Sequence, residues 1–241
     1  MSTIYDDLKD RILQLCMKNN LLGEKVIIKA RTLTTEEAIG NPEGDDFPLQ
    51  KGKERLMQAD FHGALGQAFT DRFGDFEGTL DEIFSMPVEN NFRRAIFLAS
   101  LNAVLRYLNL IKGTVHCRDK GPKECAEEMS AYIMERFGNV KVSQVGFQPP
   151  IAEALAAAFA FRLLDMDQDN IGREKFGVTV EGPEATDEVV DWADLLLVTG
   201  TTLTNDTIGR FLGKKPVIFY GTTIAGPAYL MGWERFCARS E

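Results

Sequence analysis

The pattern of hydrophobic and polar positions differs between the two halves of the chain. In the first half, apolar residues between 4 and 16 recur at helical spacing, and residues 25–30 form a short run typical of a strand. Gly, Pro and Asp concentrate at 40–48, which predicts a loop, and 79–110 is predicted to be mostly helical with a break near Pro87. A strand or two followed by helices predicts an α+β unit.

In the second half, short apolar runs alternate regularly with helical patterns. The predicted strands are 140–145, 161–166, 195–199 and 216–220, and the predicted helices are 122–137, 151–160, 186–193 and 205–212. Such alternation predicts right-handed crossovers and a parallel, doubly wound α/β sheet. If the strands, numbered in chain order, are arranged 2-1-3-4, the loops after the first and third strands flank the point where the strand order reverses.

Composition and charge narrow the class of protein. Lys and Arg number 27 against 36 Asp and Glu, a formal net charge of −9, which argues against nucleic acid or an anionic membrane surface as a partner. The first residues lack the pattern of a signal peptide, and four cysteines among 241 residues do not make a disulfide scaffold. We therefore expect a cytoplasmic globular protein with free thiols, and a homo-oligomer stays open.

Three loops that follow predicted strands carry the residues best suited to bind a small ligand. In an open α/β sheet, ligands bind beyond the carboxyl ends of the strands. Glycines and hydroxyl groups at the start of a helix can offer donors to an anion, although Thr and Asn also cap helices with no ligand present. The candidates are Gly146, Phe147 and Gln148 after the first strand, Gly200, Thr201, Thr202 and Asn205 after the third, and Gly221, Thr222 and Thr223 after the fourth.

Asp165 ends the second predicted strand and is a further candidate for ligand binding. It follows Gly146 by about 20 residues, the distance at which an acid binds the ribose in dinucleotide folds. The Gly-x-Gly-x-x-Gly turn is absent, however, and Phe147 and Pro149 would obstruct a pyrophosphate. NAD is therefore not expected, whereas a smaller nucleotide-like or anionic ligand stays open.

The first half contributes a second group of polar candidates. Glu54 and Asp71 are candidate acid or base groups, and Lys53, beside Glu54, is a candidate ligand-binding cation. A run of charges is also typical of a solvated surface, so both interpretations stay open.

His116, Cys117 and Cys125 form the one His/Cys cluster in the sequence. The spacing of the thiols fits neither a zinc ribbon nor a C-x-x-C redox pair, yet a soft metal could accept these three ligands. Buried cysteines that serve only packing are the alternative. The sequence names no cofactor, and a divalent metal stays open.

Five stretches of sequence together resemble a known family. They are Gly52-Lys-Glu-Arg-Leu-Met-Gln-Ala59, Gly66-Gln-Ala-Phe-Thr-Asp71, Gly113-Thr-Val-His-Cys117, Val145-Gly-Phe-Gln-Pro149 and Thr199-Gly-Thr-Thr-Leu-Thr-Asn-Asp-Thr207. The chain is similar here to the family described as "putative heavy-metal chelation", whose function is otherwise unknown. The resemblance implies an α+β domain like the N-terminal domain of enolase at 1–112, a Rossmann-like α/β domain at 113–241, and a site in the cleft between them.

The residues and the resemblance together lead to three functional expectations. The first is binding of a small polar or anionic molecule between the domains, a metal chelator or chelate among the candidates. The second is an enzyme that acts on a small anionic or heterocyclic metabolite in the same cleft. The third is direct metal binding through the His and Cys side chains. Whether the protein is an enzyme stays open.

Overall fold

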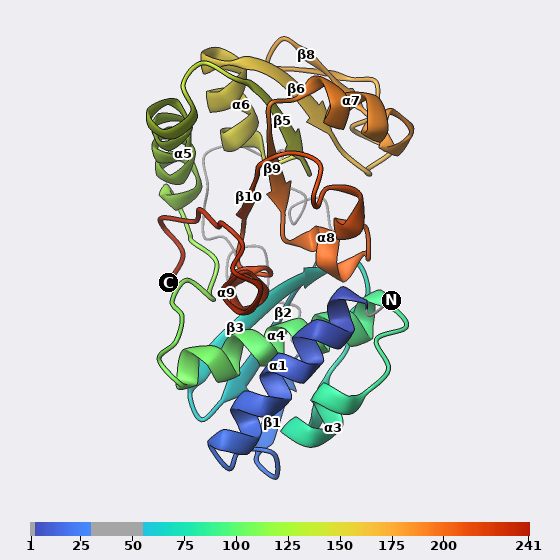
Figure 1. Ribbon diagram of the computed structural model, residues 1–241, viewed down its shortest axis with the longest axis vertical. Coiled ribbons are helices and arrows are strands. Elements are labelled where there is room, and N and C mark those ends of the chain that lie inside the picture. Colours follow the sequence, from blue (N-terminus) through green and yellow to red (C-terminus); the bar gives the residue numbers. More distant parts are fainter. Residues whose placement is uncertain (1–2, 30–54) are drawn as a thin grey trace.

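The computed structural model describes residues 3–29 and 55–241. The loop predicted at 40–48 and the candidates Lys53 and Glu54 lie outside the described residues. Among the described residues, no helix is long and apolar enough to span a membrane. The fold is mixed α/β, with one antiparallel sheet and one largely parallel sheet (Figure 1).

The first half forms an antiparallel sheet covered by helices. Its strands are β1 Lys25–Lys29, β2 Arg55–Phe61, β3 Ala64–Thr70 and β4 Phe76–Thr79, in the order β3-β2-β1-β4. Its helices are α1 Ile4–Lys18, α3 Leu80–Ser85 and α4 Asn91–Tyr107. The break predicted near Pro87 is confirmed, because α3 ends before it and α4 begins after it. The sequence predicted only one or two strands here, whereas the sheet has four among the described residues.

Close packing of α4 on this sheet depends on Gly66 in β3. A Cβ atom at Gly66 would lie 2.2 Å from the backbone nitrogen of Ala103 in α4, so a larger residue would push the helix away. The turn between β2 and β3 places His62 and Gly63 at φ +51° and +82°, as two-residue hairpin turns require. Polar residues and a glycine within these strands explain why their pattern was not recognised.

The second half forms the predicted parallel sheet. Its strands are β5 Lys141–Val145, β6 Ala160–Leu164, β7 Glu174–Lys175, β8 Val178–Glu181, β9 Leu195–Thr199 and β10 Val217–Tyr220. The order β10-β9-β5-β6-β8-β7 contains the predicted 2-1-3-4 arrangement, and the strands are parallel except for the β7–β8 pair, which was not predicted. The sequence order therefore reverses beside β5, between the loops that follow β5 and β9.

The helices of the second half follow the predicted alternation with one exception. They are α5 Gly121–Phe137, α6 Pro149–Ala158, α7 Thr186–Trp192, α8 Thr201–Thr204 and α9 Ala225–Met231, with short 3-10 turns at Pro183–Ala185 and Ile208–Arg210. The helix predicted at 205–212 is wrong. The hydroxyl of Thr207 donates to Asn205 Oδ1 at 2.6 Å and Asp206 has φ +62°. This local turn replaces the helical hydrogen bonds.

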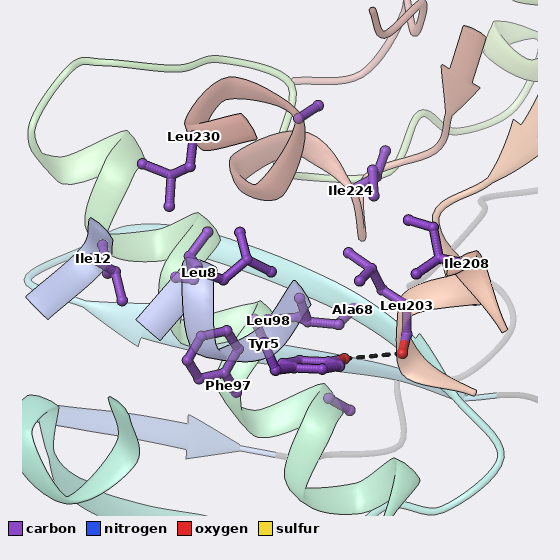
Figure 2. Packing of buried hydrophobic residues seen from close by; sticks show 14 of the residues in the cluster. Tyr5, Leu8, Ile12, Ala68, Phe97, Leu98, Leu203, Ile208, Ile224 and Leu230 are labelled. Carbon is purple, nitrogen blue, oxygen red and sulfur yellow. Dashed lines mark hydrogen bonds between the residues drawn. The ribbon is translucent and has the colours of Figure 1, made fainter. Parts of the chain in front are cut away.

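In the described part of the chain, one hydrophobic cluster spans both halves, and a second lies within the second half. The first cluster of buried side chains runs from α1 and α4 to α8 and α9 (Figure 2). Within it, the hydroxyl of Tyr5 in α1 donates to the carbonyl of Leu203 in α8 at 2.9 Å. Helix α4 is buried on all sides between residues 95 and 105, because it packs on the antiparallel sheet and also contacts α8 and α9. The cavity described next therefore lies between parts that are packed against each other.

Candidate functional site

A cavity of about 720 Å³ lies at the carboxyl ends of the parallel strands. It is lined from the second half by residues that follow β5, β6, β9 and β10. The first half supplies Phe69, Thr70, Asp71 and Asn91 to the same cavity, and His116 lines it as well. The loops after β5, β9 and β10 thus meet at one edge of the sheet and face the first half, which is the arrangement expected from the sequence.

Gly146 shapes the turn that follows β5. Its φ is +89°, and a Cβ atom there would lie 2.6 Å from Thr199 Cγ2, so this position suits glycine alone. The hydroxyl of Tyr220 donates to the carbonyl of Gly146 at 2.6 Å. The backbone N–H of Phe147 donates to Asp165 Oδ2 at 2.6 Å. The turn that carries Phe147 and Gln148 into the cavity wall is therefore held from β10 and from the residue that follows β6.

Asp165 acts mainly as a brace between loops. In addition to the bond to Phe147, its Oδ1 accepts the backbone N–H of Asp167 at 2.7 Å and a longer contact from Asn170 Nδ2 at 3.4 Å. Both carboxylate oxygens are thus engaged by protein donors. The acid of a dinucleotide fold instead directs its oxygens to a ribose, so the geometry favours a positioning role over the predicted ligand contact.

The threonines of the candidate loops mostly bond to the protein itself. Thr202 donates to the carbonyl of Thr199 at 2.7 Å, and Thr201 donates to the hydroxyl of Thr199 at 3.2 Å. Thr223 Oγ1 accepts the backbone N–H of Phe69 at 3.0 Å and so ties the two halves together. Thr222 is fully buried and is not among the cavity-lining residues. Of the hydroxyls predicted to hold a ligand, Thr201 remains the best placed.

Two of the helix starts beside the cavity are poorly suited to bind an anion. Helix α8 has only four residues, too few for a substantial helix dipole. Helix α6 begins with Pro149 and Pro150, which have no N–H, and Gln148 Oε1 caps the N–H of Ile151 at 2.7 Å. At the start of α6, the backbone donors that bind anions at other helix starts are therefore missing or already used.

His116 contributes a neutral imidazole to the cavity wall. Burial lowers its pKa, and its Nδ1 lies 2.6 Å from the carbonyl oxygen of Cys117. A carbonyl only accepts, so Nδ1 carries the proton and Nε2 keeps its lone pair. The ring packs edge-to-face on Phe69, with centroids 5.4 Å apart. His116 can therefore accept a hydrogen bond or a proton.

The cysteines are not grouped with other potential metal ligands among the described residues, where no three His, Cys, Asp or Glu side chains are grouped to hold a metal ion. Burial raises the pKa of Cys117 to about 12, so in the metal-free protein this residue is a thiol. Cys125 and Cys237 are free cysteines joined by a side-chain hydrogen bond. This hydrogen bond raises the pKa of Cys125 and lowers that of Cys237. The geometry therefore gives no support to His116, Cys117 and Cys125 as a metal centre, and this expectation stays a prediction.

Several cavity residues were not among the sequence candidates. They include Phe69, Thr70, Asn91, Asp167, Asn170, Thr204, Arg210, Phe211 and Tyr220. Thr204 lies within a predicted loop and Tyr220 adjoins another, which is a signal that could have found them. Asn91 and Asn170 reach the cavity from the start of α4 and from the turn after β6, positions that no motif marks.

Comparison with known proteins places the fold among known structures. The model of the DUF364 family, described as "Putative heavy-metal chelation", matches residues 129–225, and the resemblance found in the sequence is confirmed there. A DUF364-family protein of unknown function from Pyrococcus horikoshii superposes with a TM-score of 0.57 at 14% identity, over 92% of this chain and 80% of that one. Another from Desulfitobacterium hafniense gives 0.50 at 12% identity, over 73% and 72%. No curated protein matches the chain.

Proposed function

We propose that the protein binds a small molecule in the cavity between its two halves, and that this molecule takes part in heavy-metal chelation, as the family description suggests. One observation carries the proposal: residues from both halves line a cavity of about 720 Å³ at the carboxyl ends of the parallel strands. Binding sites for small molecules have volumes of about 300–1,000 Å³ and combine apolar walls with a few polar groups.

The finer description of the fold belongs to the same proposal. We interpret residues 1–112 as a domain like the N-terminal domain of enolase and residues 113–241 as a Rossmann-like domain. The parallel sheet, with its order reversed beside β5, supports the second assignment. Ligands of such sheets bind at this reversal, which is where the cavity lies.

An enzyme that uses the same cavity is the second candidate. The fixed tautomer of His116 favours it, because Nε2 is left as an acceptor in the cavity wall. Asp71, which directly follows β3, also lines the cavity. It accepts a hydrogen bond from Asn91 Nδ2 at 2.7 Å. These two residues are candidate base and acid groups. Turnover of a bound compound distinguishes an enzyme from a binding protein.

A thermal-shift screen with a cavity-blocking variant tests the proposal. The probes are divalent metal chlorides, nucleosides and planar nitrogen heterocycles. Gln168 lines the cavity and is exposed, so Gln168→Phe fills space without disturbing the core. Asn139 is exposed and outside the cavity lining, and Asn139→Phe is the matched control. Stabilising compounds should lose their effect in Gln168→Phe alone. Compounds that stabilise both variants equally would contradict the proposal.

A further inference from the structure

We infer that the cavity binds a planar cation that donates N–H hydrogen bonds, such as an amidine, a guanidine or a protonated heterocycle. This inference deepens the proposed function and rests on it. Three features of the cavity support it independently: the balance of charges, the unused hydrogen-bond acceptors and the aromatic walls.

The charges around the cavity favour a cation. Among the described residues that line it, Asp71, Asp165 and Asp167 are acidic and Arg210 is basic. Arg210 Nη1 already donates to the carbonyl of Pro183 at 3.2 Å, and burial keeps His116 neutral by lowering its pKa. Acidic groups in a partly enclosed cleft concentrate a negative potential. An anion would meet this potential, so a cation is the better fit.

The sequence outside the described residues is also acidic on balance. Residues 30–54 contain three basic and six acidic residues, and the whole chain has a net charge of −9.

Two buried oxygen atoms of cavity-lining residues lack a hydrogen-bond partner among the described residues. Asn170 and Thr204 both line the cavity, with 3% and 2% of their surface exposed. The two atoms are Asn170 Oδ1 and Thr204 Oγ1. The orientation of the Asn170 amide follows from Asp165, because Nδ2 and not Oδ1 faces that carboxylate. Buried acceptors without partners are costly. Both atoms are enclosed by protein, so the N–H groups of a ligand would satisfy them only with a small shift of the segments that carry them.

Aromatic rings give the cavity a surface for a flat ligand. Phe69 lines it from the first half and Phe147 from the turn after β5, and Tyr220 and Phe211 contribute further rings. Aromatic faces attract cations, most strongly where water is excluded. Lys175 Nζ already lies 5.8 Å from the centroid of the Phe147 ring, so Phe69 is the ring more open to a ligand cation. A planar cation can use these rings and the acidic groups at the same time, whereas a compact ion such as a metal uses only the second.

Asp71 is the residue best placed to pair with the charge. Its side chain has a neutral partner, Asn91, and the residue is exposed beside the cavity. Asp165, by contrast, already accepts backbone donors with both oxygens. We therefore assign Asp71 as the residue whose carboxylate pairs with the positive charge of the ligand.

Benzamidine, benzamide and benzoate test the inference, because they share a shape and differ in charge. Backbone amide NMR titrations of the full chain would give both the affinity and the location of each compound. Benzamidine should shift the amides of residues 69–71, 147–148 and 199–205 and bind at least about tenfold more tightly than the other two. Asp71→Asn should weaken it about tenfold, whereas Asp75→Asn, an exposed residue outside the cavity lining, should not.

The outcomes separate the inference from the proposed function. Benzoate or benzamide binding in the cavity as tightly as benzamidine would overturn the cation preference and leave the cavity as the site. Binding of benzamidine there that Asp71→Asn does not change would overturn the assignment of Asp71. Shifts confined to other surfaces, or none with any of the three compounds, would count against the proposed function itself.

Discussion

Asn102 Oδ1 accepts the backbone N–H of Gly226 at 2.7 Å, and this buried bond joins the two halves of the molecule. The amide nitrogen of Asn102 donates to the carbonyls of Gln67 at 2.9 Å and Thr222 at 3.0 Å. A Cβ atom at Gly226 would lie 2.1 Å from Leu101 Cδ2, so α9 can approach α4 only because this residue is glycine. The cavity wall formed by β3 and the loop after β10 is fixed by this contact.

Replacement of Asn102 by leucine should strongly destabilise the protein. The variant keeps the side-chain size and leaves the Gly226 N–H and at least one carbonyl buried without a partner. We expect the free energy of unfolding to fall by about 2–4 kcal/mol, as measured by urea denaturation. Asn139→Leu, at an exposed position, should change it by less than about 0.5 kcal/mol. Equal effects of both variants would show that the buried amide of Asn102 does not stabilise the fold.

Gly146→Ala should lower the free energy of unfolding by more than the unfavourable backbone conformation alone would. Gly146 and Gly172 both have positive φ, +89° and +79°, but a Cβ atom meets Thr199 at the first position and open space at the second. We expect Gly172→Ala to lower the free energy of unfolding by about 1 kcal/mol and Gly146→Ala by about 2–4 kcal/mol. Indistinguishable unfolding curves for the two variants would argue against close packing of the turn on β9.

Asp165→Asn should loosen the turn that bears Phe147. An amide has one acceptor oxygen, so it cannot accept both the Phe147 and the Asp167 N–H groups, which the two carboxylate oxygens now bind. We expect a loss of about 1–3 kcal/mol in stability and faster hydrogen exchange at the Phe147 amide. Exchange that stays as slow as in the parent protein would contradict the bracing role.

Burial of His116 makes stability depend on pH in a defined direction. Its pKa is lowered in the folded state, so the unfolded chain binds a proton that the native state does not bind. The free energy of unfolding should therefore decrease as the pH falls from about 6.5 toward the lowered folded pKa. His116→Gln should reduce this slope in urea unfolding, whereas His62→Gln, at an exposed position, should leave it in place. The opposite pattern would contradict a buried neutral imidazole.

The parallel sheet could be predicted because its signals are local. Each apolar run such as residues 195–199 is followed by a helical pattern, and this alternation restricts the strand order to few choices. The antiparallel sheet was underestimated because Gly66 and the polar residues of β2 and β3 obscure the strand pattern. Their burial comes from α4, which lies more than 20 residues further along the chain.

The loops of the candidate site were predicted, but the roles of their side chains were not. A sequence shows that Thr202 and Thr223 follow strands, yet their partners, Thr199 and Phe69, are set by the fold. Likewise, the hydrogen bond between the thiols of Cys125 and Cys237 joins α5 to the last residues of the chain. No local pattern in the sequence indicates this contact. Long-range contacts of this kind decide whether a polar residue binds a ligand or the protein itself.

A crystal structure with the compound that gives the largest thermal shift tests the central claim most directly. The account predicts that this compound lies between Phe147 and residues 69–71, at the carboxyl ends of β5 and β9. A compound that binds instead in the open groove between Leu212 and Glu234, or anywhere else outside this cavity, would contradict it.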